Sequence, residues 1–252
     1  MNRTIFWLRT ALVLAASVLS GCRGEVELGV VAGLDACHRC NMVIDQVNQA
    51  CGYIEDDRLV VFDSPVCLLG RYEEFRNSRA SIPVQIFFAD YNDGLWHPAK
   101  STAFLHTDHI PTIMNAGVVA FGSSEAAEEM RRHPDEKVTD WIGFQTVRGT
   151  PNRVVAVLFS DNAMVPDTVE LEKGDLGELR MKGDALAEDL TIAVTGYPET
   201  GEVTVPASGE EVGLRILALR PGSGFPVIDV SGGRALGRVK VSGAHTLDEE
   251  EM

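Results

Sequence analysis

Two cysteines and a methionine fall within six residues near the start of the chain, in the run Cys37-His38-Arg39-Cys40-Asn41-Met42. A Cys-x-x-Cys pair brings two sulfur atoms within reach of one metal ion or of each other. Thiolate and thioether donors suit Cu(I), a soft ion, whereas zinc does not ordinarily use methionine. A c-type haem needs histidine directly after the second cysteine, and Asn41 stands there instead. The run therefore predicts a metal site that favours Cu(I).

Two other interpretations of Cys37 and Cys40 stay open. The pair could form a structural disulfide, or it could be a redox-active dithiol as in thiol–disulfide oxidoreductases. A thioredoxin-like pair would begin a helix after the strand of a βαβ unit, and no clear helix follows Cys40. We therefore expect a metal-binding protein and not an enzyme.

Further sulfur and imidazole donors lie in the first 150 residues. Cys67 is predicted to fall in the first turn of a helix, where the helix dipole favours a thiolate. A disulfide between Cys51 and Cys67 is the alternative that we prefer for these two residues. Beside the principal candidates, the additional candidate metal ligands are His38, His109 and Cys67.

Two similar patterns suggest the elements that position these residues. Residues 58–62 (RLVVF) are typical of a buried strand, and Ser64 with Pro65 then predicts a helix that extends to about Phe75. Residues 118–121 are again apolar, and a serine cap precedes a second helix that ends near His133. A further strand is expected at 82–89. The two units, near 42–75 and 114–133, predict a paired β-β-α arrangement.

The second half of the chain is expected to be all-β. It contains short β-like runs separated by glycine- or proline-bearing turns, and no helix of useful length is apparent. Near-regular spacing of short strands is typical of a β-sandwich. The expected strands are residues 154–159, 168–172, 178–181, 190–194, 212–219, 227–230 and 238–241. We expect a boundary between two domains near residues 149–152, where Gly, Pro and Asn occur together.

The N-terminus predicts export from the cytoplasm. Residues 1–21 combine two arginines, a short apolar run and the sequence Leu19-Ser20-Gly21 directly before Cys22, which resembles a bacterial lipobox. Cys22 is then the expected lipidation site, and the protein would be anchored on the periplasmic side of a bacterial membrane. The net charge is −15, from 22 basic and 37 acidic residues, which argues against a nucleic-acid partner.

Residues 37–147 resemble the NosL family, the copper lipoproteins of the nitrous oxide reductase gene cluster. The matching positions are Cys37-x-x-Cys40-x-Met42, Val61-Phe62-Asp63, Asp90-Tyr91, Ala103-Phe104, Met114 and Ala120-Phe121. Two departures are Asn41, where the family has glycine, and Ile113-Met114-Asn115, where it has Pro-Met-Gly. Asparagine is the residue that best replaces glycine in a left-handed turn.

The resemblance implies a treble-clef-like α+β fold and a Cu(I) chaperone that serves nitrous oxide reductase or its maturation proteins. On this basis the expected metal ligands are Cys37, Cys40, Met42 and Met114.

The C-terminal region, residues 152–242, loosely resembles a cupredoxin sandwich. After Pro151, however, the chain has no cysteine and only one histidine, His245, which is too few ligands for a blue-copper site. The expected organisation is a signal peptide (1–21), an anchor linker (22–36), the copper-binding domain (37–149), the sandwich (152–242) and an acidic tail (243–252).

Overall fold

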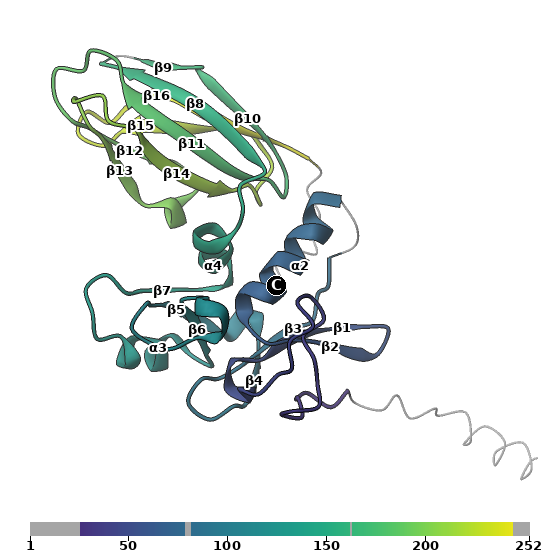
Figure 1. The fold of residues 1–252 in the computed structure, drawn as a ribbon. Coiled ribbons are helices and arrows are strands. Elements are labelled where there is room, and N and C mark those ends of the chain that lie inside the picture. Colours follow the sequence, from purple (N-terminus) through teal and green to yellow (C-terminus); the bar gives the residue numbers. More distant parts are fainter. Residues whose placement is uncertain (1–25, 79–81, 162, 244–252) are drawn as a thin grey trace, which may run out of the picture.

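The computed structural model describes residues 26–78, 82–161 and 163–243. The predicted signal peptide, Cys22 and all of the acidic tail except Gly243 lie outside these residues. The fold is α+β, as predicted from the sequence. Figure 1 shows two lobes. We call residues 26–149 the cysteine lobe and residues 152–243 the sandwich lobe.

The first β-β-α unit of the cysteine lobe begins with a tight hairpin. Strands β1 (Cys51–Glu55) and β2 (Arg58–Phe62) are joined by Asp56 and Asp57, which both have positive φ, as a two-residue type I′ turn requires. Helix α2 (Pro65–Ser78) follows, and its cap is Ser64, whose Oγ accepts the N–H of Cys67 at 3.3 Å. The sheet order is β2-β1-β3-β4, with β3 at Ile86–Ala89 and β4 at Trp96–Pro98.

A second β-β-α unit repeats this pattern. Strands β5 (Ala103–His106) and β6 (Val118–Phe121) are antiparallel, and helix α3 (Ser124–Met130) follows. Ser123 caps α3 by accepting the N–H of Ala126 at 3.2 Å, as Ser64 caps α2. Strand β7 (Lys137–Thr139) completes the sheet β6-β5-β7. This second unit begins with β5 at Ala103, whereas the sequence predicted its start near residue 114.

Helix α4 (Trp141–Arg148) was not expected from the sequence. Asp140 caps it by accepting the N–H of Gly143 at 2.7 Å. Its rings join the aromatic core, where Phe144 stacks on Phe104 at a centroid distance of 4.5 Å. Four 3₁₀ turns among the described residues are η1 (Val47–Gln49), η2 (Ala99–Ser101), η3 (Ile113–Asn115) and η4 (Pro198–Thr200).

The sandwich lobe consists of two sheets, ordered β10-β16-β15-β12-β13 and β14-β11-β8-β9. Alternating side chains of both sheets fill one hydrophobic cluster, which includes Val157, Ile192 and Ile216. The strands are β8 (Arg153–Ser160), β9 (Ala163–Val165), β10 (Thr168–Glu172), β11 (Leu176–Gly183), β12 (Leu190–Val194), β13 (Glu202–Val205), β14 (Val212–Leu217), β15 (Gly222–Asp229) and β16 (Arg234–Ser242).

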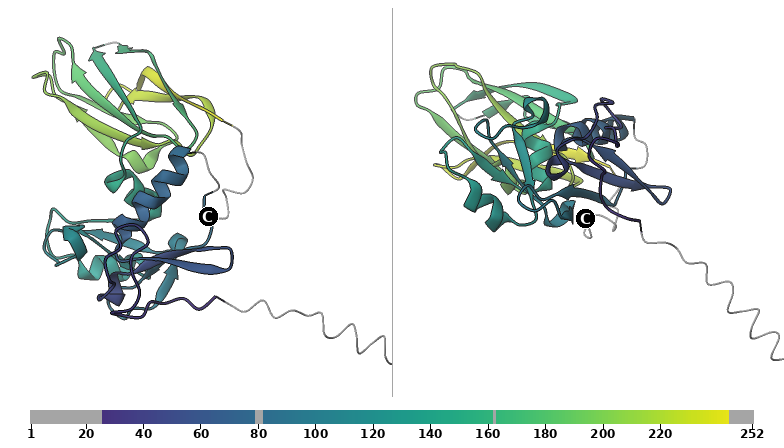
Figure 2. Two further views of the ribbon diagram at one scale, coloured as in Figure 1. Left: turned by 45° about the vertical axis from the view of Figure 1, so that its right-hand side comes forward. Right: turned by 60° about the horizontal axis from the view of Figure 1, so that its bottom comes forward.

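The two lobes meet where α2 and α4 approach the sandwich (Figures 1 and 2). Arg215 of β14 donates hydrogen bonds to the carbonyls of Thr146, Val147 and Gly149, which lie at the C-terminal end of α4. Among the described residues, the buried hydrophobic side chains form separate clusters, one within 157–241 and two within 37–144. That each lobe folds as an independent domain stays a prediction.

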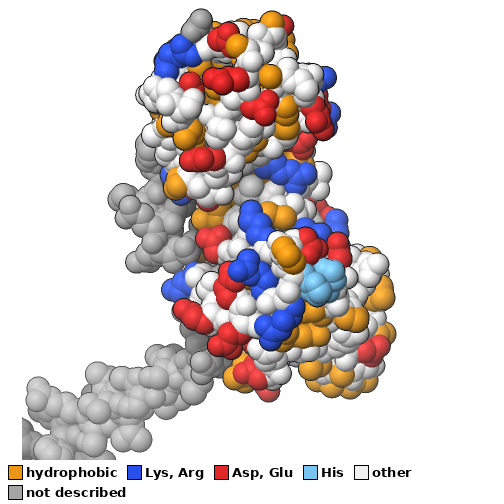
Figure 3. Space-filling view, turned by 90° about the vertical axis from the view of Figure 1, so that its left-hand side faces the viewer, with side chains coloured by type: hydrophobic (Ala, Val, Ile, Leu, Met, Phe, Trp, Pro, Cys, Tyr) orange, Lys and Arg blue, Asp and Glu red, His pale blue; other side chains and the backbone are white. Residues whose placement is uncertain are grey.

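The surface of both lobes carries mixed charge. Figure 3 shows acidic and basic side chains interspersed on one face of the molecule, with exposed histidine on the cysteine lobe. Among the described residues, no helix is both long enough and apolar enough to cross a membrane.

Candidate metal centre

Residues 37–42 fold into a tight turn that presents both cysteines. The N–H of Cys37 donates to the carbonyl of Met42 at 2.8 Å, and the N–H of Asn41 donates to the carbonyl of Cys37 at 2.9 Å. Asn41 has a φ of 59°, so the chain reverses through the left-handed region at this residue. The expectation that asparagine would support a turn here is confirmed.

The turn is held against β2 and α2. The N–H of His38 donates to the carbonyl of Val61 at 2.9 Å, which docks the turn on the end of β2. Arg39 lies across Gly70 of α2, where a Cβ atom would be 2.3 Å from the guanidinium carbon. The Arg39 side chain also reaches Glu74, with an Nε–Oε1 distance of 3.8 Å. A glycine in α2 therefore allows the turn to lie close to the helix.

Four side chains converge where the turn, the end of β2 and the start of α2 meet. One ligand atom from each of Cys37, Cys40, Asp63 and Cys67 lies within 4.8 Å of every other. Asp63 and two of the cysteines are buried, and Cys40 is half-buried. The Cys40 thiol donates to Oδ2 of Asp63 at 3.2 Å. The donor set is thus three sulfur atoms and one carboxylate.

Hydrogen bonding sets which of these thiols ionises first. The hydrogen bond from the Cys67 thiol is the largest effect on Cys37, and with backbone N–H donors it outweighs burial and lowers the pKa of Cys37 to about 6. The same hydrogen bond and burial raise the pKa of Cys67. Burial is the main cause that raises the pKa of Cys40. The site therefore holds one thiolate at neutral pH and two thiols that donate hydrogen bonds.

The preferred disulfide between Cys51 and Cys67 is wrong, because Cys37, Cys40, Cys51 and Cys67 are all free thiols. The two residues have different surroundings. Cys67 hydrogen-bonds with Cys37, whereas Cys51 lies in β1 between Phe62 and Phe88, and burial raises its pKa far above the ordinary value. The structural disulfide considered for Cys37 and Cys40 is not formed either.

The two methionines expected as ligands are on the surface. Met42 and Met114 are 46% and 62% exposed. Met114 has a φ of 55° within η3, and Gln49 holds this segment by accepting the N–H of Ile113 at 3.0 Å and donating to the carbonyl of Pro111 at 3.3 Å. That either thioether is a ligand stays a prediction.

Neither histidine expected as an additional ligand belongs to the group of four converging side chains. His38 is exposed, and its ring packs edge-to-face with that of Phe62, with a centroid distance of 6.0 Å. His109 is grouped instead with His133 and Asp135. The structure thus brings Cys37, Cys40 and Cys67 together and adds Asp63, which sequence reasoning missed. The sequence feature that could have identified Asp63 is an acidic residue directly between a buried strand and a helix cap.

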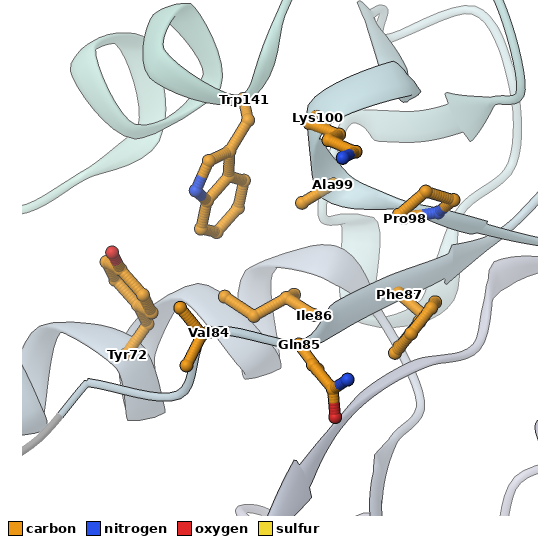
Figure 4. A pocket seen from close by; sticks show the side chains of 9 residues that line it. All are labelled: Tyr72, Val84, Gln85, Ile86, Phe87, Pro98, Ala99, Lys100 and Trp141. Atoms are coloured by element: carbon orange, nitrogen blue, oxygen red, sulfur yellow. The ribbon is translucent and has the colours of Figure 1, made fainter. Parts of the chain in front are cut away.

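An apolar pocket of about 260 Å³ lies elsewhere on the cysteine lobe. In Figure 4 the aromatic rings of Tyr72 and Trp141 and the side chain of Ile86 face it, and Lys100 lies at one side. None of the four converging residues lines this pocket, so it is separate from the candidate metal centre.

The chain matches no family profile and no curated protein. Among solved structures, it is similar to the metal-binding domain of the Cu(I)-exporting P-type ATPase CopA of Streptococcus pneumoniae D39, crystallised with Cu(I). The identity is 16%, the match covers 37% of this chain and 91% of that chain, and the TM-score is 0.30. A TM-score this low does not define a common fold, so the chemistry of the site follows from its own residues.

Proposed function

We propose that Cys37, Cys40 and Cys67 bind Cu(I) and that the protein is a copper carrier with no catalytic turnover. The observation that supports this most directly is the convergence of three free thiols within 4.8 Å of one another. Thiolates select soft ions, and Cu(I) is the soft ion that also accepts the thioether sulfurs expected from Met42 and Met114.

The polarity of the site suits capture of a monovalent ion. Cys37 already supplies a thiolate, so Cu(I) displaces a proton only when Cys40 or Cys67 joins it as a ligand. The carboxylate of Asp63 accepts a hydrogen bond from the Cys40 thiol and so restrains this sulfur beside the other two. Because Cys40 is only half-buried, an incoming donor from a partner can reach the ion there.

The proposed recipient is nitrous oxide reductase or one of its maturation proteins. This part rests on the resemblance of residues 37–147 to the NosL family, and the resemblance also supports a lipid anchor at Cys22 on the periplasmic side of a bacterial membrane. Copper would pass by ligand exchange to a site with more or better donors. The mass of the mature chain tests the anchor, because a protein without acyl groups on Cys22 would exclude it.

Zinc is the second candidate ion, and Asp63 is the observation that favours it. Three thiolates and a carboxylate oxygen complete a tetrahedral Zn(II) site, whereas Cu(I) has no need of the oxygen. A site of this kind would be structural, because all four positions would be filled by the protein.

Competition with chelators under reducing, anaerobic conditions separates the two ions. In a Cys22→Ser background, we expect Cys37→Ser and Cys67→Ser each to weaken Cu(I) binding by more than about 100-fold, a larger loss than removal of an outer-shell partner causes. Cys51→Ala is the matched control, because Cys51 is an equally buried thiol outside the donor set, and it should bind Cu(I) as the parent does.

Asp63→Asn decides the role of the carboxylate. For a Cu(I) site, we expect a loss of at most about tenfold, the lower range for an outer-shell hydrogen-bond partner. Loss of Zn(II) binding in this variant, together with tighter binding of Zn(II) than Cu(I) by the parent, would overturn the copper proposal. A parent that binds neither ion when fully reduced would favour a redox or structural role.

A further inference from the structure

A second group of donor side chains lies on the surface of the cysteine lobe. His109 precedes η3, and His133 and Asp135 lie between α3 and β7. Nε2 of His109 is 3.2 Å from Oδ2 of Asp135, and the rings of His109 and His133 stack with their centroids 3.6 Å apart. One donor atom from each residue lies within 4.8 Å of the other two.

A buried carboxylate holds both histidines in place. Glu136 accepts the N–H of His133 at 2.9 Å and the hydroxyl of Thr107 at 2.5 Å. The Thr107 oxygen in turn accepts the N–H of His109 at 3.0 Å. The hydrogen bond from Thr107 is the main cause that lowers the pKa of Glu136 to about 2, so this carboxylate is ionised at neutral pH. Two segments far apart in the sequence are thus fastened to one anchor, which fixes the backbones of the two histidines side by side.

We propose that His109, His133 and Asp135 form a second metal site, separate from the cysteines, that takes a divalent ion of borderline softness, with Cu(II) bound most tightly. The proposal concerns a different ion and different ligands from the copper carrier function, so either can fail alone.

The separation of His109 and Asp135 fits one ion, and His133 offers a third donor atom within 4.8 Å of both. Ligand atoms that each lie about 2.0–2.1 Å from a metal are roughly 3 Å apart in a square-planar or tetrahedral site, close to the observed 3.2 Å between His109 and Asp135. The side chains of His109 and Asp135 are 41% and 67% exposed, so an ion can reach them and water can fill the remaining positions.

The donor types select the class of ion. A site of imidazole nitrogen and carboxylate oxygen without any thiolate suits Zn(II), Ni(II) and Cu(II). Among the divalent first-row metals, Cu(II) has the highest affinity for such a site. Ca²⁺ and Mg²⁺ are disfavoured, because these ions bind through oxygen atoms. Cu(I) is disfavoured, because no sulfur belongs to the group.

Titration of the full chain with Cu(II), followed by electron paramagnetic resonance, tests the proposal. Saturating the thiols first with Ag(I), which is diamagnetic, prevents them from binding or reducing Cu(II). We expect one equivalent of Cu(II) with a signal that shows nitrogen ligands. His109→Ala and His133→Ala should each weaken this binding by more than about tenfold, and Asp135→Asn should weaken it less.

His97→Ala is the matched control, because His97 belongs to another group of donor side chains, with Asp90 and Asp93. It should leave the bound equivalent unchanged. Since His109 and His133 are exposed, their alanine variants should keep the circular dichroism of the parent, so that lost binding reports on the site. Parental affinity in His133→Ala, loss of the signal in His97→Ala, or absence of a nitrogen-ligated equivalent in the parent would overturn the second site.

Discussion

Cys37 determines the chemistry of the metal centre at the scale of single residues. Burial alone would raise the pKa of its thiol, as it does for Cys51. The hydrogen bond from Cys67 and the neighbouring backbone N–H groups reverse this effect and lower the pKa of Cys37 to about 6. The same contact raises the pKa of Cys67, so the pair shares one proton and carries one negative charge at neutral pH.

This assignment predicts the pH dependence of the reduced, metal-free protein. Because the pKa of Cys37 is lowered, its thiolate should persist as the pH falls and disappear only near pH 6. An ordinary thiol would already be protonated below about pH 8.5. Ultraviolet absorbance of the thiolate, followed across pH, should therefore show one equivalent that titrates near pH 6 and the other thiols at much higher pH.

Cys67→Ala tests the cause of the shift. Without this hydrogen-bond donor, the pKa of Cys37 should rise, because the largest effect that opposes burial is then lost. Cys51→Ala should leave the step near pH 6 in place, since Cys51 makes no hydrogen bond with Cys37. A step that stays near pH 6 in Cys67→Ala would show that the pair does not share a proton.

At the scale of elements, the site depends on three short segments that meet. The turn at 37–42 supplies two thiols, Asp63 directly follows β2, and the first turn of α2 supplies Cys67. Backbone hydrogen bonds fix the turn, and the Ser64 cap fixes the start of the helix. The geometry of the thiols is therefore set by local backbone structure more than by contacts between the side chains themselves.

The left-handed conformation of Asn41 predicts how this turn responds to substitution. At a φ of 59°, a Cβ atom approaches the following carbonyl at a cost of roughly 1 kcal/mol, which asparagine tolerates better than alanine does. We expect Asn41→Gly to be at least as stable as the parent and Asn41→Ala to be less stable by about 1 kcal/mol. Chemical denaturation measures both. An alanine variant as stable as the parent would mean that the turn is not constrained at this position.

Much of the fold was predictable because its signals are local. Apolar runs and breakers within a few residues predict the strand at 58–62 and the serine caps of α2 and α3. The same kind of local pattern predicts the short strands of the sandwich. Helix α4 was missed, because its eight residues give too short a pattern to separate from a loop. The contact of Cys67 with Cys37, and of His109 with His133, depends on tertiary packing across 30 and 24 residues, which no local pattern encodes.

At the scale of the whole molecule, the junction between the lobes contains a buried charge. Arg76 of α2 is 8% exposed, and its three guanidinium nitrogens make no hydrogen bond to any described residue. The nearest carboxylate oxygen in an ion pair is Oε1 of Glu73, at 3.6 Å from Nη2. The same oxygen accepts the N–H of Thr150 at 2.6 Å. Burial accordingly lowers the pKa of Arg76.

Removing this charge while keeping its volume should stabilise the junction. A buried cation without hydrogen bonds keeps its desolvation cost, and replacing a buried ionic group by an apolar side chain of similar size is often neutral or stabilising by about 1–4 kcal/mol. We expect Arg76→Met to unfold at equal or higher denaturant concentration than the parent. Glu73→Gln is the informative control, because it removes the compensating carboxylate and should destabilise the chain. If Arg76→Met instead lowers the stability as Glu73→Gln does, the ion pair between these two residues of α2, with an Nη2–Oε1 distance of 3.6 Å, makes a net favourable contribution to folding.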